Sequence, residues 1–323
     1  MPSLPDPAGS RAVLVGASRY PRMADDRQLP AVEANLADLA AALTDARVWG
    51  LPDGNVEVLH QPADEDTVLV ALRRAAEAAT DTLVVYYAGH GLVDPVAGSE
   101  LGLALPDAYE PGGAHMSVGY DRVRRELLVT ARHVPRKVVV VDCCWSGRAV
   151  RGAFGESGLP GTAIEGTAVL AASAATRQAL APPGARHTAF TGALLDVLTG
   201  GVPGGPPLLD VGAVYAAVKA RIGERSPVPQ FGGAGEGARI VLARNNAAPR
   251  VAAVPASPET RLRLRRAGRY AEAHDLRAAV VVDDPAALAA RRAELRRLGY
   301  YAQAAELDAL IDQPGQEVPS ELG

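Results

Sequence analysis

Two hydrophobic patterns alternate along the chain up to residue 245. Short runs that are apolar throughout, or that alternate between apolar and polar residues, predict β-strands. Longer segments with apolar residues every three or four positions predict amphipathic helices. The predicted strands are Arg11–Ser18, Asn55–His60, Asp81–Gly89, Lys137–Asp142, Thr167–Ser173 and Ala238–Ala243. The predicted helices are Gln28–Asp45, Asp66–Thr80, Tyr120–Ala131, Thr188–Thr199 and Val211–Ile222.

The order of these elements determines the expected fold class. Strands that alternate with helices and are apolar on both faces form mostly parallel sheets, with helices covering each side. The sequence therefore predicts an α/β protein, a three-layer α/β/α sandwich with a mostly parallel sheet, in residues 11–245. Residues 1–10 are rich in Pro and Gly and are expected to be disordered.

The chain changes character after residue 245. Residues 246–258 are rich in Pro and Ala and are expected to form a linker. Arg265–Val280 and Arg296–Ile311 are similar in sequence, and a repeat of this kind predicts paired helices. We therefore expect a small C-terminal α-helical module in residues 259–312, used to bind a protein partner or docked on the main domain, followed by a tail in residues 313–323.

Charge and hydrophobic content narrow the classes of function. The formal net charge is −4 and the pI is about 5.9, so there is no electrostatic case for binding nucleic acid or an anionic membrane. No apolar run approaches the ~20 residues that a membrane span needs, and the N-terminus lacks an apolar signal segment. We therefore expect a cytoplasmic protein that has neither nucleic acid nor a membrane as its partner. The high content of Ala, Arg, Gly and Pro is typical of a GC-rich genome and favours a bacterial source.

The two cysteines, Cys143 and Cys144, are adjacent. Neighbours in sequence make a poor structural disulfide, and two thiols alone cannot form a zinc site. No loop can be assigned as a calcium site, and nothing else in the sequence indicates a metal or a cofactor. The cysteines are therefore either packing residues or reactive groups in a reducing compartment.

Two of the predicted strands end in reactive groups. Asp81–Gly89 leads into His90 and Gly91, and Lys137–Asp142 leads into the cysteine pair. The carboxyl ends of parallel strands gather at one edge of a sheet, so the histidine and a thiol are expected to meet there. A histidine near a thiol lowers the thiol pKa and can later protonate a leaving amine. The backbone N–H groups of Gly91 and Cys144 can hold the oxyanion of a tetrahedral intermediate.

The succession of strand, Gly-His-Gly, strand and Asp-x-Cys-x-Ser-Gly resembles the caspase and metacaspase family of cysteine peptidases. The histidine precedes the cysteine by roughly 50 residues, as in caspases. The resemblance covers roughly Arg11–Asn245, includes Ala172–Ala179 and Thr188–Leu198, and leaves out the C-terminal repeat. It implies a caspase-like fold and an enzyme that cleaves protein or peptide substrates. In the family motif the nucleophile falls at Cys144, and strand alternation then directs Cys143 into the packing of the sheet.

The same resemblance implies roles for further residues. With His90 and Cys144 as the catalytic dyad, Asp142 lies in the S1 pocket and selects Arg or Lys at P1. Glu33 is the candidate for a second acid from the first helix. Ser173, in the segment similar to the smaller subunit, is a further candidate for substrate binding.

Regulation and biological role also follow only from the resemblance. The segment after the nucleophile is often processed in this family, which makes Arg148 and Arg151 candidate autocleavage sites. Some members need Ca²⁺, but no motif here supports that dependence. Two functions remain open: a cysteine endopeptidase that acts in bacterial defence or cell death, and a catalytically inactive caspase-like scaffold that recruits partners through its C-terminal helices.

Overall fold

The computed structural model describes most of the chain. It covers residues 3–93, 101–109, 116–144, 146, 149, 166–172, 184–222, 228–234, 236–248, 251–255, 262–263, 265–266, 268, 277–281 and 285–312. The chain divides into two units, residues 1–248 and residues 249–323, and each is considered by itself.

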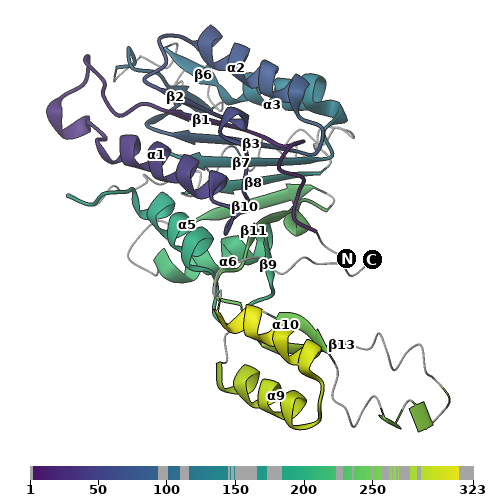
Figure 1. The fold of residues 1–323 in the computed structure, drawn as a ribbon. Helices are drawn as coiled ribbons and strands as arrows, with labels where there is room; N and C mark the ends of the chain where they lie inside the picture. The colour runs from purple at the N-terminus through teal and green to yellow at the C-terminus, as the bar shows by residue number, and fades with distance from the viewer. Residues whose placement is uncertain are drawn as a thin grey trace. The chain divides into compact units, whose positions relative to one another are not determined.

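A six-stranded sheet forms the centre of the first unit (Figure 1). Its strand order is β10-β8-β7-β3-β1-β2, and every neighbouring pair is parallel except β10 with β8. The strands are β1 (Arg11–Gly16), β2 (Val56–His60), β3 (Thr82–Ala88), β7 (Arg136–Asp142), β8 (Thr167–Ala171) and β10 (Gln230–Ala234). The mostly parallel sheet that the sequence predicts is confirmed.

Helices cover both faces of this sheet (Figure 1). One face packs against α1 (Ala31–Thr44), α5 (Ala189–Gly200) and α6 (Val211–Ile222). The other face packs against α2 (Glu65–Ala78) and α3 (Tyr120–Val129). Successive side chains of a strand enter opposite layers, so Leu14 of β1 joins the first apolar cluster and Val13 joins the second. The predicted three-layer sandwich is confirmed.

Smaller elements complete the first unit. The antiparallel sheet β4-β5-β6 follows β3, and β11 pairs with β9. These strands are β4 (Gly91–Val93), β5 (Leu101–Ala104), β6 (Ser117–Gly119), β9 (Leu208–Asp210) and β11 (Val241–Arg244). The 3-10 helices are η1 (Asp25–Arg27), η2 (Asp53–Asn55), η4 (Thr130–His133) and η5 (Gly237–Arg239). Because β4 begins directly after His90, the small sheet holds the chain where it leaves β3.

Residues 3–10 pack against the first unit, so the expectation that this segment is disordered is wrong for them. The indole Nε1 of Trp49 donates to the carbonyl of Pro5 (3.1 Å), and the amide of Asn55 donates to the carbonyl of Pro7 (3.0 Å). The N–H of Thr80 donates to the carbonyl of Gly9 (2.8 Å). A buried indole requires an acceptor, and the N-terminal segment supplies it.

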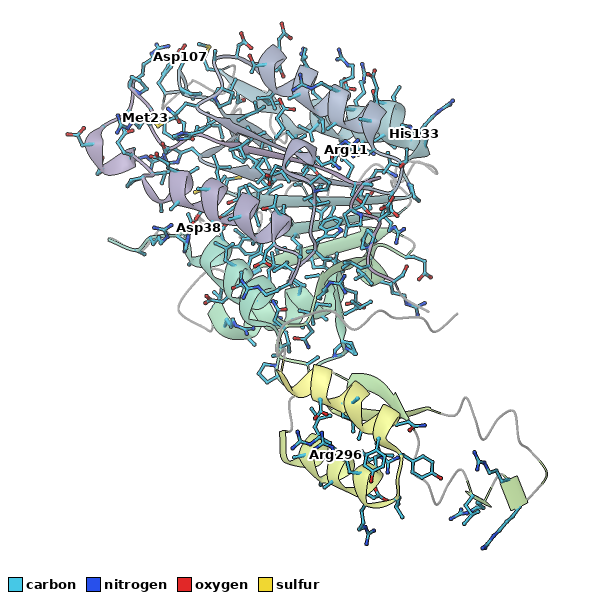
Figure 2. All side chains as sticks on the ribbon, viewed as in Figure 1. Arg11, Met23, Asp38, Asp107, His133 and Arg296 are labelled. Atoms are coloured by element: carbon cyan, nitrogen blue, oxygen red, sulfur yellow. The ribbon has the colours of Figure 1, made fainter. Side chains whose placement is uncertain are left out.

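The described residues of the second unit form two strands and a helical hairpin. Its elements are β12 (Val251–Pro255), β13 (Arg277–Val281), α9 (Pro285–Arg297) and α10 (Tyr301–Asp312). Arg292 and Arg296, the latter labelled in Figure 2, both donate to the carboxylate of Asp308, over 3.0 Å and 2.7 Å. Leu295 and Leu307 are buried in the unit.

Two expectations about the second unit are wrong. Strand β12 lies within the predicted linker 246–258, and β13 begins in the first copy of the repeat, within the predicted helical module 259–312. The two strands pair antiparallel. Each has two valines in its sequence, and β-branched residues favour extended backbone over helix. The second copy of the repeat is helical, as predicted, in α10.

Candidate active site

The carboxyl ends of β3 and β7 bring the histidine and the cysteines to one edge of the sheet. The two strands are parallel neighbours, and their last residues, Ala88 and Asp142, lie opposite each other. The N–H of Gly89 donates to the carbonyl of Asp142 (3.3 Å), which extends the contact beyond the strands. His90 and Cys144 each follow this pair by two residues. The register of the sheet therefore places them at matching positions just beyond the ends of adjacent strands.

Gly91 packs directly against the cysteine segment. A β-carbon at Gly91 would lie 2.0 Å from the backbone oxygen of Cys144 and 3.0 Å from the Sγ of Cys143. No side chain fits at such distances. The turn that contains His90 is thus in backbone contact with the Cys144 segment, and only glycine permits that contact.

The two thiols lie in different environments. Cys143 is buried in the apolar cluster under α2 and α3, whereas Cys144 is partly exposed. Burial raises the pKa of the Cys143 thiol well above its ordinary value, and the nearby Cys144 and Asp142 add to that shift. Because the thiolate is the nucleophilic form, Cys143 is poorly suited to attack a substrate. Cys144 is therefore the candidate nucleophile.

The imidazole of His90 is buried and is held on two sides. Its Nε2 lies 2.7 Å from the backbone carbonyl oxygen of Arg27, and its ring packs on Tyr20 with the ring centroids 4.7 Å apart. A carbonyl oxygen only accepts hydrogen bonds, so Nε2 carries the ring proton. In the neutral imidazole the lone pair is then on Nδ1. Nδ1 is the nitrogen that can take a proton from a thiol.

Asp142 is buried at the end of β7 among neutral hydrogen-bond donors. Its Oδ2 accepts from the hydroxyls of Thr188 and Thr191, both over 2.5 Å. Behind them, the amide of Asn35 donates to the Thr188 hydroxyl (2.9 Å), and the hydroxyl of Tyr86 lies 2.8 Å from that of Thr191. Burial raises the pKa of Asp142, and the two threonine hydroxyls oppose this shift. No cation of the described residues contributes to the environment of this carboxyl.

The segment that carries Thr188 is anchored to α1 by Asp38, which is labelled in Figure 2. The carboxylate of Asp38 accepts from Arg186 through Nε (2.7 Å) and Nη2 (2.8 Å), and from Nε2 of His187 (2.6 Å). The Arg186 hydrogen bonds, with a smaller contribution from His187, lower the pKa of Asp38 to about 2. This anchor holds the start of α5, and with it Thr188, close to Asn35.

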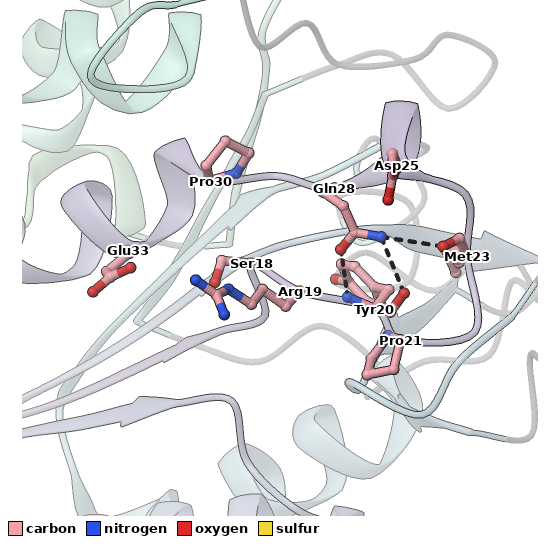
Figure 3. A pocket seen from close by; sticks show the side chains of 9 residues that line it. All are labelled: Ser18, Arg19, Tyr20, Pro21, Met23, Asp25, Gln28, Pro30 and Glu33. Atoms are coloured by element: carbon pink, nitrogen blue, oxygen red, sulfur yellow. Dashed lines mark hydrogen bonds between the residues drawn. The ribbon is translucent and has the colours of Figure 1, made fainter.

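A cavity of about 390 Å³ lies beside Tyr20, the residue whose ring packs on His90 (Figure 3). The loop after β1 and the first turn of α1 form its walls. Tyr20 and Gln28 line it, together with two acidic side chains, Asp25 and Glu33, and one basic side chain, Arg19. Its volume lies within the range of small-ligand pockets and accommodates a long side chain.

The family model for the caspase domain matches residues 10–237, which is well over half of the chain. The chain belongs to the caspase-domain family. Among solved structures, it is similar to caspase-1 from Spodoptera frugiperda, with 14% identity and a TM-score of 0.48, over 72% of this chain and 89% of that one. No curated protein matches it. As a caspase-domain protein, it is a cysteine-type endopeptidase.

The structure of this caspase-domain protein brings some of the predicted site residues together and separates others. His90, Gly91, Asp142 and Cys144 lie at one edge of the sheet. Glu33 lines the cavity beside Tyr20, and the residues that bind Asp142 are Thr188 and Thr191. The remaining candidates lie outside the described residues: Arg148, Arg151 and Ser173. The described part of the chain contains no group of three possible metal ligands, and none of its helices is long and apolar enough to cross a membrane.

Sequence reasoning missed the residues that act through hydroxyl, amide or backbone groups. Asn35, rather than Glu33, links α1 to the Asp142 cluster. The role of Asn35 could have been predicted from the sequence, because it is a polar residue within the apolar stripe that packs α1 on the sheet. Thr188 and Thr191 had a weaker signal, since they are spaced three apart at the start of a helix. No sequence signal indicates the contact of the Arg27 carbonyl with His90, because every residue has a carbonyl.

Proposed function

We propose that this caspase-domain protein cleaves peptide bonds with Cys144 as the nucleophile and His90 as the general acid and base. The backbone contact between Gly91 and Cys144 carries the proposal, because it joins the ends of β3 and β7. Nδ1 of His90 takes the thiol proton, and the thiolate attacks the scissile carbonyl carbon. The imidazolium protonates the departing amine and leaves a thioester. Water, deprotonated by Nδ1, then hydrolyses the thioester and restores the thiol.

We assign the developing oxyanion to the N–H groups of Gly91 and Cys144. The pairing of β4 with β5 supports the role of the Gly91 N–H as an oxyanion donor. The N–H of Ala104 donates to the carbonyl of His90 (3.0 Å), so that carbonyl faces β5. Across the trans peptide bond between His90 and Gly91, the N–H points opposite to that carbonyl. The N–H of Gly91 is therefore directed away from β5.

We assign the P1 side chain of the substrate to Asp142 and expect it to be Arg or Lys. The carboxylate lies two residues before the nucleophile and is buried among hydroxyl groups. A guanidinium or ammonium group is the partner that a buried carboxylate binds most strongly. The cavity beside Tyr20 is lined by two acidic side chains, Asp25 and Glu33, against one basic side chain, Arg19, and this excess of negative charge also favours a basic substrate.

Fluorogenic peptides that differ only at P1 test this function. With the full-length protein, we expect Arg and Lys peptides to be hydrolysed with a kcat/KM at least about 100-fold above that of the Asp peptide, because only a cation pairs with Asp142. Hydrolysis should disappear after alkylation by iodoacetamide. A preference for Asp at P1 would exclude the role of Asp142. The absence of any thiol-dependent hydrolysis, with or without Ca²⁺, would instead support the inactive scaffold.

We propose that the same specificity acts on the chain itself, after Arg148 or Arg151. The purified wild-type protein is expected to yield two fragments whose new ends, found by mass spectrometry, follow one of these arginines. The Cys144→Ala protein should stay intact. A double variant, Arg148→Gln with Arg151→Gln, should stay intact and still hydrolyse Arg peptides. If the wild-type and Cys144→Ala proteins give the same fragments, autocleavage is excluded.

We further propose a regulated role in bacterial defence or cell death, exerted on proteins of the cytoplasm. The resemblance to the caspase and metacaspase family supports this role, and the separate second unit offers a place for a protein partner. Substrates can be trapped on the Cys144→Ala protein, which should bind them without completing the reaction. Proteins that bind it and not a Cys144→Ala, Asp142→Asn double variant are the candidates.

A further inference from the structure

Tyr20 contacts His90 through both its ring and its hydroxyl group. It lies in the loop after β1 and is fully buried. Its ring packs on the imidazole with the centroids 4.7 Å apart and an interplanar angle of 52°. Its hydroxyl oxygen accepts the backbone N–H of His90 over 2.9 Å. One tyrosine therefore holds both the side chain and the backbone of the candidate base.

A second tyrosine completes the contact with the His90 peptide. The hydroxyl of Tyr87 lies 2.9 Å from the carbonyl oxygen of His90 and 2.8 Å from that of Ala104. A β-carbon at Gly89 would lie 2.7 Å from the Tyr20 hydroxyl and 2.5 Å from that of Tyr87. Glycine is needed here because both hydroxyls must reach the backbone of His90. The N–H and the carbonyl of His90 thus each face a buried phenol.

The loop that carries Tyr20 is closed on itself by Gln28 (Figure 3). The side-chain oxygen of Gln28 accepts the N–H of Tyr20 (2.7 Å). Its amide nitrogen donates to the carbonyls of Tyr20 (3.1 Å), Met23 (3.2 Å) and Ala24 (3.2 Å). The residue before it, Arg27, supplies the carbonyl that holds the imidazole Nε2. A single loop therefore presents Tyr20 and the Arg27 carbonyl to the imidazole from two sides.

We propose that Tyr20 is a positioning residue that keeps Nδ1 of His90 directed at the Cys144 thiol. This inference rests on the proposed roles of His90 and Cys144. Two movements would misalign Nδ1: rotation of the ring, which the phenol packed on it opposes, and displacement of the His90 backbone N–H, which the Tyr20 hydroxyl opposes. Misalignment of a proton-transfer group slows the chemical step more than it weakens substrate binding.

The residues near His90 determine what the pH dependence of Cys144 reactivity reports. Among the described residues, Tyr20 and Tyr87 contact His90, and Cys143 and Cys144 pack against the next residue, Gly91. Burial raises the pKa of both tyrosines and of Cys143, so these groups stay protonated near neutral pH. The reactivity of Cys144 between about pH 5 and 9 therefore reports on its proton exchange with His90.

The test is the rate of Cys144 alkylation by iodoacetamide as a function of pH, with the modified residue identified by mass spectrometry. Tyr20→Phe keeps the ring and removes the hydroxyl. We expect it to slow alkylation at pH 7 about tenfold, to shift the alkylation profile to higher pH, and to lower kcat for an Arg peptide about tenfold with KM unchanged. Tyr20→Leu, which also removes the ring, should have a larger effect on each.

Two control variants separate the possible outcomes. Tyr120→Phe removes a hydroxyl from a buried tyrosine of α3 that does not contact His90, and it should leave both measurements unchanged. His90→Ala should shift the alkylation profile further than Tyr20→Phe does. If His90→Ala has no effect, the proposed dyad is wrong. If His90→Ala shifts the profile and Tyr20→Phe does not, the inference about Tyr20 is overturned.

A second variant covers the case in which Tyr20→Phe does not fold. Gln28→Leu leaves Tyr20 and His90 intact and removes the hydrogen bonds that close the loop. A shift of the alkylation profile to higher pH, smaller than that of His90→Ala, would support the inference. An unchanged profile would overturn it. Circular dichroism and thermal unfolding show in each case whether the variant is folded.

Discussion

Replacing Cys144 with Ala is expected to abolish peptide hydrolysis, and replacing His90 with Ala is expected to lower kcat by about 10³- to 10⁴-fold. Without the Cys144 sulfur no thioester can form, and the only other thiol of the chain, Cys143, is buried with a raised pKa. Without His90 the thiol loses its base and the leaving amine loses its proton donor. Steady-state hydrolysis of an Arg peptide measures both losses.

The adjacent cysteine offers a matched control for this prediction. Cys143→Ala removes a sulfur that packs in the apolar cluster beside Gly91. We expect it to keep activity within about tenfold of wild type and to reduce the free energy of unfolding by about 1 kcal/mol, as for a small buried truncation. If Cys143→Ala abolishes hydrolysis and Cys144→Ala does not, the nucleophile has been assigned to the wrong cysteine.

Asp142→Asn is expected to lower kcat/KM for Arg and Lys peptides by about 30- to 1,000-fold. Asparagine keeps the shape of the side chain and an oxygen that can accept from Thr188 and Thr191. It removes the negative charge that the P1 cation would meet. The measurement is kcat/KM for peptides with Arg, Lys, Gln and Asp at P1. The ratio of Arg to Gln should fall with the substitution.

The raised pKa of Asp142 adds a pH dependence to this prediction. The buried carboxylate takes up a proton at a higher pH than an exposed aspartate, and hydrolysis of Arg peptides needs its charged form. For wild type, kcat/KM should therefore fall as the pH is lowered through that raised pKa. The folded state favours the neutral acid, so the charged form reduces stability above the unfolded-state pKa. Asp142→Asn is thus not expected to lower the thermal unfolding midpoint at pH 7.

A surface aspartate provides the control for the change in charge. Asp45 lies at the C-terminal end of α1, where it pairs with Arg47. Asp45→Asn alters the net charge as Asp142→Asn does and should leave P1 selectivity unchanged. If Asp142→Asn retains the wild-type ratio of Arg to Gln hydrolysis, Asp142 does not read the P1 side chain.

The strands that carry the candidate site were predictable because each has a complete local signal. Thr82–Ala88 and Arg136–Asp142 are buried along nearly their whole length, and both run into a turn with reactive residues. The edge strand β10 has no such signal. Its sequence, Gln-Phe-Gly-Gly-Ala, lacks an apolar pattern, and its antiparallel pairing with β8 rests on backbone hydrogen bonds.

The sequence by itself determined the α/β layers, the meeting of His90 with Cys144, and the need for glycine between them. These follow from strand periodicity and from residues within a few positions of a strand end. Only the tertiary structure decided what surrounds the pair. Asp142 is bound by Thr188, 46 residues away, and the two segments that hold His90, at Arg27 and Tyr20, lie 63 and 70 residues from it. Carbonyl and hydroxyl groups occur throughout any chain, so folding alone selects the few that reach the site.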